Sequence, residues 1–234
     1  MKISPYGDSA LLVQFNDGID ESTNREVIAL YQYLQASDLF EYLIPAYNSL
    51  TIGLDKEKLS RKEAQAQIEA FDFNSLQSAI KPKNYLIPVC YEDAHALDIK
   101  EVESLTGLSR DKIIELHSQK TYHVYMLGFL AGFAYMGQLP GNLQVPRKDK
   151  PRLSVPKGAV GLAGAQTGIY PCEAPGGWQI IGATPLELFD PTVLEPNLLN
   201  PGDRVRFRSI TVDEFKLIEI KIATGIYELE YFDD

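Results

Sequence analysis

The sequence has little of what marks several protein classes. Its 234 residues include two cysteines, Cys90 and Cys172, far apart in the chain, which gives neither a disulfide framework nor a recognisable zinc-binding spacing. Basic residues are outnumbered, with 22 Lys and Arg against 32 Asp and Glu, and the net charge is −10. This balance argues against non-specific binding to nucleic acid or to anionic membrane surfaces, both of which need cationic groups.

Long apolar runs are also missing. No apolar segment approaches the about 18 residues that suggest a membrane span. The N-terminal stretch MKISPYGDSALLVQF lacks a charged region followed by an uninterrupted apolar run, so it does not resemble a secretory signal. We therefore expect a cytoplasmic protein without membrane partners. The composition, 45% apolar and 23% charged, is ordinary for a soluble globular protein with its own core.

The first part of the chain alternates between strand and helix patterns. Strands are expected at residues 9–15, 42–46, 50–54 and 84–91, the last interrupted by Pro88. One helix is expected after Asp20 or Ser22, either of which suits an N-cap, and a second after Ser60, which has capping-box spacing to Glu63. This order is typical of the ferredoxin-like split βαβ unit. We therefore predict an N-terminal ferredoxin-like α/β domain at residues 1–83.

The pattern of expected helices and strands changes after residue 91. Two short helices are expected, broken at Gly107, with Ser109 as the cap of the second. From Thr121 onward, short apolar runs alternate with glycine and proline: YHVYMLGF, AVGLAG, WQIIG, RVRFRSI and FKLIEI. Closely spaced short strands predict a β-sandwich or a β-barrel for residues 84–234.

Three glycine-rich clusters in this second part admit two interpretations. They are residues 125–140 (YMLGFLAGFAYMGQLP), 145–158 (VPRKDKPRLSVPKG) and 164–182 (GAQTGIYPCEAPGGWQIIG). One interpretation is tight barrel turns, including a two-residue hairpin loop at Gly176-Gly177. The other is a binding site, in which aromatic side chains wall a pocket and Arg147 or Arg152 matches a carboxylate or phosphate with its planar fork.

Several ordered motifs carry a resemblance to a known family. They are GDSALLVQF, TGLSRDKIIELHS, VYMLGFLAGFAYMGQLP, PRLSVPKGAVGLAGAQTGIYP, APGGWQIIGATP and LFDP, and together they span nearly the whole chain. The chain resembles the family of the 5-oxoprolinase B subunit, the sporulation kinase A inhibitor and allophanate hydrolase subunit 1, and is similar to half of the urea carboxylase carboxyltransferase domain. The resemblance implies an α+β protein, in which a small α/β domain precedes a cyclophilin-like β-barrel.

The resemblance also implies a function. A protein of this type is expected to act with a C-type partner, itself a cyclophilin-fold protein, and with an A-type partner in the ATP-dependent opening of 5-oxoproline to L-glutamate. ATP is expected to be used by the assembled complex, with no metal ligands in this chain. The matched positions imply His117, Arg147, Arg152 and Gln166 as catalytic candidates. They imply substrate-binding candidates at Phe129, Phe133, Tyr135, Gly164, Thr167, Gly168, Tyr170, Gly176, Gly177 and Trp178.

Alternatives remain open at this point. His117 lies near a helix C-terminus, where the helix dipole favours an imidazolium, or it transfers protons. The chain also departs from the family pattern, with Ala183 in place of a usual arginine, Ala174 in place of a serine, and Ala131 and Ala134 in place of two prolines. The alternative functions are a regulator that inhibits a sensor histidine kinase and a component of the allophanate hydrolase or urea carboxylase type.

Overall fold

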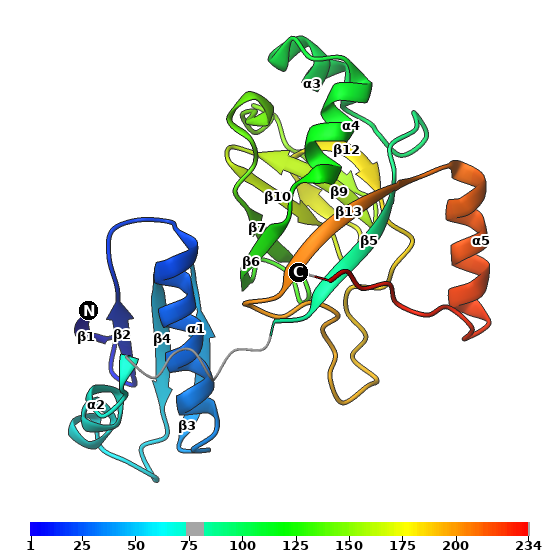
Figure 1. The fold of residues 1–234 in the computed structure, drawn as a ribbon. Helices are drawn as coiled ribbons and strands as arrows, with labels where there is room; N and C mark the ends of the chain where they lie inside the picture. Colours follow the sequence, from blue (N-terminus) through cyan, green and yellow to red (C-terminus); the bar gives the residue numbers. More distant parts are fainter. Residues whose placement is uncertain (74–81, 234) are drawn as a thin grey trace. The chain divides into compact units, whose positions relative to one another are not determined.

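A computed structural model describes residues 1–73 and 82–233 of the chain. The chain divides into two compact units, Met1–Pro82 and Lys83–Asp234. The ribbon in Figure 1 runs from the blue N-terminal unit to the green, yellow and red elements of the second. Each unit has its own hydrophobic core.

The first unit is an antiparallel four-stranded sheet packed against two helices. The strand order is β1-β2-β4-β3. Its elements are β1 (Lys2–Tyr6), β2 (Ala10–Gln14), α1 (Glu21–Gln35), β3 (Phe40–Pro45), β4 (Ser49–Leu54) and α2 (Arg61–Glu69). Of the two predicted caps for α1, Asp20 is the one that accepts a hydrogen bond from the Thr23 N–H. The capping box of Ser60 and Glu63 is present at α2.

The core of this unit follows from the helical spacing of apolar residues in α1 and from their alternation along the strands. Val27, Leu30 and Leu34 line the buried face of α1, and alternate residues of the strands, such as Leu50 and Ile52, face them. These side chains are 1% exposed or less, so the helices cover one face of the sheet.

The connectivity differs from the predicted split βαβ order in its last strand. Residues 84–90 form β5 (Asn84–Cys90), which pairs in parallel with β13 in the second unit. The fourth strand of the first sheet is instead β1, which was not predicted. It precedes β2 in the chain and pairs with it in antiparallel orientation. Serine and proline break the apolar alternation of β1, and this weakens its strand signal in the sequence.

The second unit is built on a closed barrel, as the run of short strands predicts. The strands follow one another in the order β10-β7-β6-β13-β5-β12-β9. Besides β5, these are β6 (Tyr122–Leu127), β7 (Ala134–Gly137), β9 (Ala159–Ala163), β10 (Gln166–Ile169), β12 (Gln179–Ala183) and β13 (Arg204–Ile210). A two-stranded ribbon, β8 (Arg152–Val155) with β11 (Ala174–Gly176), lies outside the barrel order.

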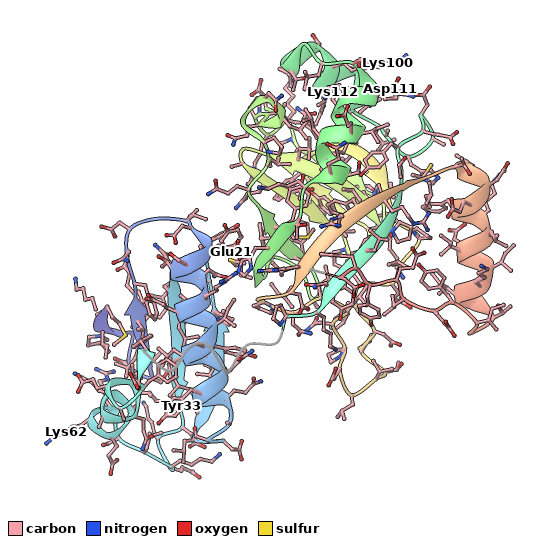
Figure 2. All side chains as sticks on the ribbon, in the orientation of Figure 1. Glu21, Tyr33, Lys62, Lys100, Asp111 and Lys112 are labelled. Carbon is pink, nitrogen blue, oxygen red and sulfur yellow. The ribbon has the colours of Figure 1, made fainter. Side chains whose placement is uncertain are left out.

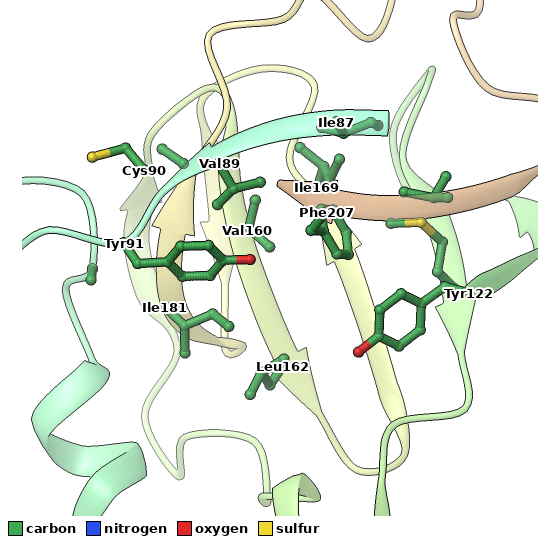
Figure 3. Packing of buried hydrophobic residues seen from close by; sticks show 14 of the residues in the cluster. Ile87, Val89, Cys90, Tyr91, Tyr122, Val160, Leu162, Ile169, Ile181 and Phe207 are labelled. Carbon is green, nitrogen blue, oxygen red and sulfur yellow. The ribbon is translucent and has the colours of Figure 1, made fainter. Parts of the chain in front are cut away.

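Large apolar side chains fill the barrel interior. Figure 3 shows Val160, Leu162 and Ile169 opposite Ile87, with the rings of Tyr91, Tyr122 and Phe207 among the same cluster. The helices that contribute to this core include α3 (Ile99–Thr106) with Val102 and α4 (Arg110–Gln119) with Ile113 and His117. As predicted, the two helices are separated at Gly107 and Ser109 caps α4; Gly107 ends α3 in a left-handed conformation.

One expected strand is a helix. The run FKLIEI lies within α5 (Val212–Ala223), which begins where the Thr211 side chain accepts a hydrogen bond from the Glu214 N–H. Phe215 and Ile218 are spaced at i and i+3 and form its buried face. The alternation of apolar and charged residues therefore fits a helical stripe better than a strand. Among the described residues, none of the helices is long and apolar enough to cross a membrane.

Several charged side chains of the helices point away from these cores. In Figure 2, Lys100 on α3 and Asp111 and Lys112 on α4 extend outward from their helices. All three are exposed.

Candidate functional site

A small aromatic core lies apart from the barrel interior. It contains Phe133, Tyr170 and Trp178, with Tyr135 at its edge. The rings pack edge to face, with centroid separations of 5.4 Å between Phe133 and Trp178 and 5.2 Å between Phe133 and Tyr170. Trp178 is only 4% exposed. This packed cluster is where the aromatic residues of two of the glycine-rich segments meet.

The glycines beside this cluster have a packing reason. A Cβ atom on Gly161 would lie 2.9 Å from Cβ of Trp178, and one on Gly168 would lie 3.1 Å from both the Trp178 and the Phe133 rings. A Cβ atom on Gly176 would overlap the Tyr170 hydroxyl. Glycine therefore lets the large rings lie directly on the outer face of the strands.

The predicted hairpin loop at Gly176-Gly177 is wrong. Gly176 belongs to β11, which pairs with β8 and not with the following strand β12. The two-residue loop is instead Gly164-Ala165, which joins the paired strands β9 and β10. Gly164 has a φ of 58°, and its N–H donates to the Val145 carbonyl at 2.7 Å.

Arg147 extends over the edge of the aromatic core. Its guanidinium carbon lies 5.8 Å from the centroid of the Trp178 ring, within cation–π range. Burial raises the pKa of the Tyr135 and Tyr170 hydroxyls, whereas the positive charge of Arg147 lowers both. Arg147 is exposed, and within residues 1–73 and 82–233 no carboxylate forms an ion pair with it. The edge of the core thus presents the cation of Arg147 beside the half-buried Tyr135, while Tyr170 is buried within the core.

Arg152 is occupied by an internal carboxylate. Its Nη1 donates to Oδ2 of Asp98 at 2.7 Å, and its Nη2 donates to Oδ1 of the same residue. Asp98 is 3% exposed and also accepts from the Ile180 N–H at 2.7 Å. Although burial alone would raise the pKa of Asp98, hydrogen bonds from Arg152, Ile180 and Lys148 hold it below its ordinary value. The Arg152 guanidinium, which the sequence suggested as a partner for a ligand carboxylate, is therefore paired with Asp98.

Lys148 joins the same network. Its Nζ donates to Oδ1 of Asp98 at 3.0 Å and to Oε2 of Glu101. Its backbone N–H donates to the Gly177 carbonyl at 2.7 Å, and the buried Gln179 side chain links Glu101 at 3.1 Å to the Pro146 carbonyl at 3.4 Å. The backbone on both sides of Arg147 is thus fixed by hydrogen bonds to β12 and to the segment that precedes it.

Two predicted site residues, His117 and Thr167, lie inside the barrel instead. The buried His117 ring makes a hydrogen bond through Nδ1 with the Tyr91 hydroxyl at 2.7 Å. It makes a second one through Nε2 with the Thr167 hydroxyl at 2.9 Å. It also stacks on Phe207, with centroids 4.4 Å apart. Burial lowers the pKa of His117 to about 3, so the imidazole is neutral near pH 7. The helix-dipole interpretation required an imidazolium and is not supported by this environment.

Phe129 forms a separate exposed feature in the β6–β7 turn. Its φ of 67° is unusual for an aromatic residue, and the Leu130 N–H donates to the Gly128 carbonyl at 2.8 Å to close a strained three-residue turn. The ring is 62% exposed and lies edge-on to Phe133 at 5.7 Å. A shallow cavity of about 390 Å³ lies beside it, lined by Leu127, Gly128, Phe129, Leu130, Ala131, Gly132, Phe189 and Asn197.

The structure therefore brings most of the sequence-predicted residues to one outer face. Gln166 and Gly168 share that face of β10 because side chains alternate along a strand, and their partners in β7 are Gly137 and Tyr135. Thr167 lies between them in sequence and points to the opposite, interior side, toward His117.

The acidic residues of this region were not predicted. An aspartate before a helix, such as Asp98, is normally interpreted as its N-cap, but the Asp98 side chain makes no capping hydrogen bond. Its carboxylate and that of Glu101 pair with Arg152 and Lys148 instead. Within the ranges that the structure describes, no group of three or more His, Cys, Asp or Glu residues is placed to hold a metal ion.

Comparison with known proteins places the chain in a family. A family model described as "Carboxyltransferase domain, subdomain C and D" matches residues 1–199. The chain belongs to this carboxyltransferase-domain family. It is 37% identical over 229 residues to the 5-oxoprolinase B subunit of Bacillus subtilis, covering 92% of this chain and 95% of that protein.

Solved structures agree with this membership. A protein designated TTHA0988 is 35% identical with a TM-score of 0.78 over 86% of this chain, which spans only 40% of that longer chain. The urea amidolyase of Kluyveromyces lactis shares the fold, with a TM-score of 0.74 at 18% identity, covering 99% of this chain and 16% of that one. Ala183, where the resemblance implies an arginine, is a buried barrel residue.

Proposed function

We propose that this chain is one component of an ATP-dependent 5-oxoprolinase complex that converts 5-oxoproline to L-glutamate. The observation that carries the proposal is the 37% identity to a 5-oxoprolinase B subunit over 95% of that protein's length. The word subunit in that name implies partner chains. We propose partners of the C type and the A type, and no activity of this chain alone.

The chemistry of the Arg147 site suits the substrate. 5-Oxoproline is a small lactam ring with one carboxylate. Arginine matches a carboxylate with two parallel N–H donors, while the half-buried Tyr135 lies beside it and Trp178 supplies an apolar wall. We propose that Arg147 binds the substrate carboxylate, that Gln166 on the same face hydrogen bonds the lactam, and that Phe129 contributes to the surface around it.

ATP would supply the phosphoryl group that turns the stable lactam into an activated electrophile. The Arg147 loop is poorly suited to hold a triphosphate, because two of its cations, Lys148 and Arg152, are already paired with Asp98 and Glu101. We therefore propose that ATP is bound mainly by another component of the complex. The role of this chain is to orient the substrate through its carboxylate.

The test is reconstitution. The chain is co-expressed with candidate A-type and C-type partners, and ATP hydrolysis that depends on 5-oxoproline is measured. We expect Arg147→Ala to raise KM about ten- to a hundredfold, the cost of losing a charged hydrogen-bonded contact. Lys157→Ala removes an exposed cation outside this loop and is the matched control, expected to change KM less than about twofold. An intact complex without turnover would reject the proposal.

A further inference from the structure

The loop that carries Arg147 is strongly basic in an acidic protein. Residues 147–152, RKDKPR, hold four cations and one carboxylate. Without further groups, such a loop would favour multiply charged anions such as phosphates, because each added cation strengthens the attraction for a second negative charge.

Two carboxylates from another segment change this charge. Asp98 pairs with Arg152 and Lys148, and Glu101 pairs with Lys148. With these two and Asp149 counted, four cations are balanced by three carboxylates, and one net positive charge remains. Within the described structure, Arg147 and Lys150 are the cations of this loop without an ion-pair partner. Arg147 is the one that lies over Trp178, so its positive charge is the one at the aromatic core.

We propose that Asp98 and Glu101 fix the Arg147 site at one net positive charge, so that it accepts a monocarboxylate and discriminates against dianions. The two acidic residues are specificity-determining and positioning residues, because they act through Arg152 and Lys148 and leave Arg147 as the group that meets the ligand. This inference deepens the proposed function and rests on it only for the choice of 5-oxoproline as the monocarboxylate.

The chain contains its own reporter for this site. Trp178 is the only tryptophan of the sequence, and its ring lies under the Arg147 guanidinium. Its fluorescence emission in the isolated chain can therefore be titrated with a monoanion, 5-oxoproline, and with a dianion, sulfate. No partner protein or turnover is needed for this measurement.

The decisive variant is Glu101→Gln. Glu101 is 46% exposed at its side chain, so the change removes one negative charge with little structural cost. We expect it to raise the sulfate affinity about three- to tenfold relative to the 5-oxoproline affinity, since a tenfold change corresponds to about 1.4 kcal/mol. Asp98→Asn should shift the same ratio further. Because Asp98 is buried, this variant counts only if its circular dichroism spectrum is native.

Glu187→Gln is the matched control. Glu187 pairs with Lys157 on the surface, so its substitution makes the same charge change outside the network. We expect its affinity ratio to equal that of the unmodified chain. A ratio unchanged within twofold in folded Glu101→Gln would overturn the proposal. It would also be overturned if the unmodified chain bound sulfate as tightly as 5-oxoproline, or if neither anion changed Trp178 emission.

The outcome separates this inference from the proposed function. If the ratio shifts but the reconstituted complex has no 5-oxoproline-dependent ATP hydrolysis, the charge selection stands and the proposed function fails. If the complex turns over but the ratio does not shift, the proposed function stands and the charge selection fails.

Discussion

The two faces of strand β10 show opposite uses of polar chemistry. Thr167 points into the barrel and hydrogen bonds the buried His117, whereas its neighbour Gly168 supports Trp178 on the outside, beneath Arg147. The inner face is closed to solvent, and burial holds its histidine neutral. The outer face keeps a charged group accessible over a rigid aromatic wall. The residues that suit ligand binding are thus separated by one position in sequence from residues that stabilise the core.

The first prediction tests whether the outer aromatic cluster is a true core. Trp178→Ala removes a ring that is 4% exposed and contacts Phe133 and Tyr135, so we expect a loss of about 3–5 kcal/mol in the free energy of unfolding. Chemical denaturation followed by circular dichroism measures this. Leu153→Ala, at a residue that is 91% exposed, is the control and should change little. A loss below about 1 kcal/mol for Trp178→Ala would contradict the packing described here.

The second prediction tests the inner face. Because the folded-state pKa of His117 is about 3, below the ordinary value of 6.5, its contribution to stability is complete above pH 6.5 and is lost as the pH falls toward 3. The slope is about 1.4 kcal/mol per pH unit within that window. We expect His117→Gln, which cannot take up a proton, to lose less stability than the unmodified chain between pH 6.5 and 5.

A companion variant separates burial from hydrogen bonding. Thr167→Val removes the hydroxyl that contacts Nε2 of His117 but leaves the ring buried. Since burial is the cause of the lowered pKa, this variant should keep the pH slope of the unmodified chain while its stability is lower at every pH. Equal slopes in all three proteins would show that the pKa of His117 is not lowered in the folded chain.

The sequence predicted the features that depend on local signals. Helix caps at Asp20, Ser60 and Ser109 and the barrel strands were predictable because their signals are local: a side-chain acceptor at a helix start, or a short apolar run between glycines. The aromatic and glycine residues were correctly grouped as a feature, although they form a packed cluster with the cation of Arg147 at its edge.

Long-range pairing could not be predicted in the same way. The engagement of Arg152 with Asp98 joins residues 54 positions apart, and no local pattern indicates it. The burial of His117 likewise depends on Tyr91, Thr167 and Phe207, which come from three distant segments. The exchange of β5 for β1 in the first sheet has the same cause, since a strand pattern does not indicate which partner it pairs with.

The smallest expected effect on stability distinguishes Arg147 from its neighbour Arg152. An exposed cation–π contact contributes roughly 0.5–1 kcal/mol, so Arg147→Ala should cost no more than that in the free energy of unfolding. Arg152→Ala leaves the buried carboxylate of Asp98 without its bidentate partner, so a larger loss, about 3 kcal/mol, is expected. Both are measured by denaturation at pH 7. Equal losses for the two variants would contradict the distinction between Arg152 as a structural residue and Arg147 as a residue available to a ligand.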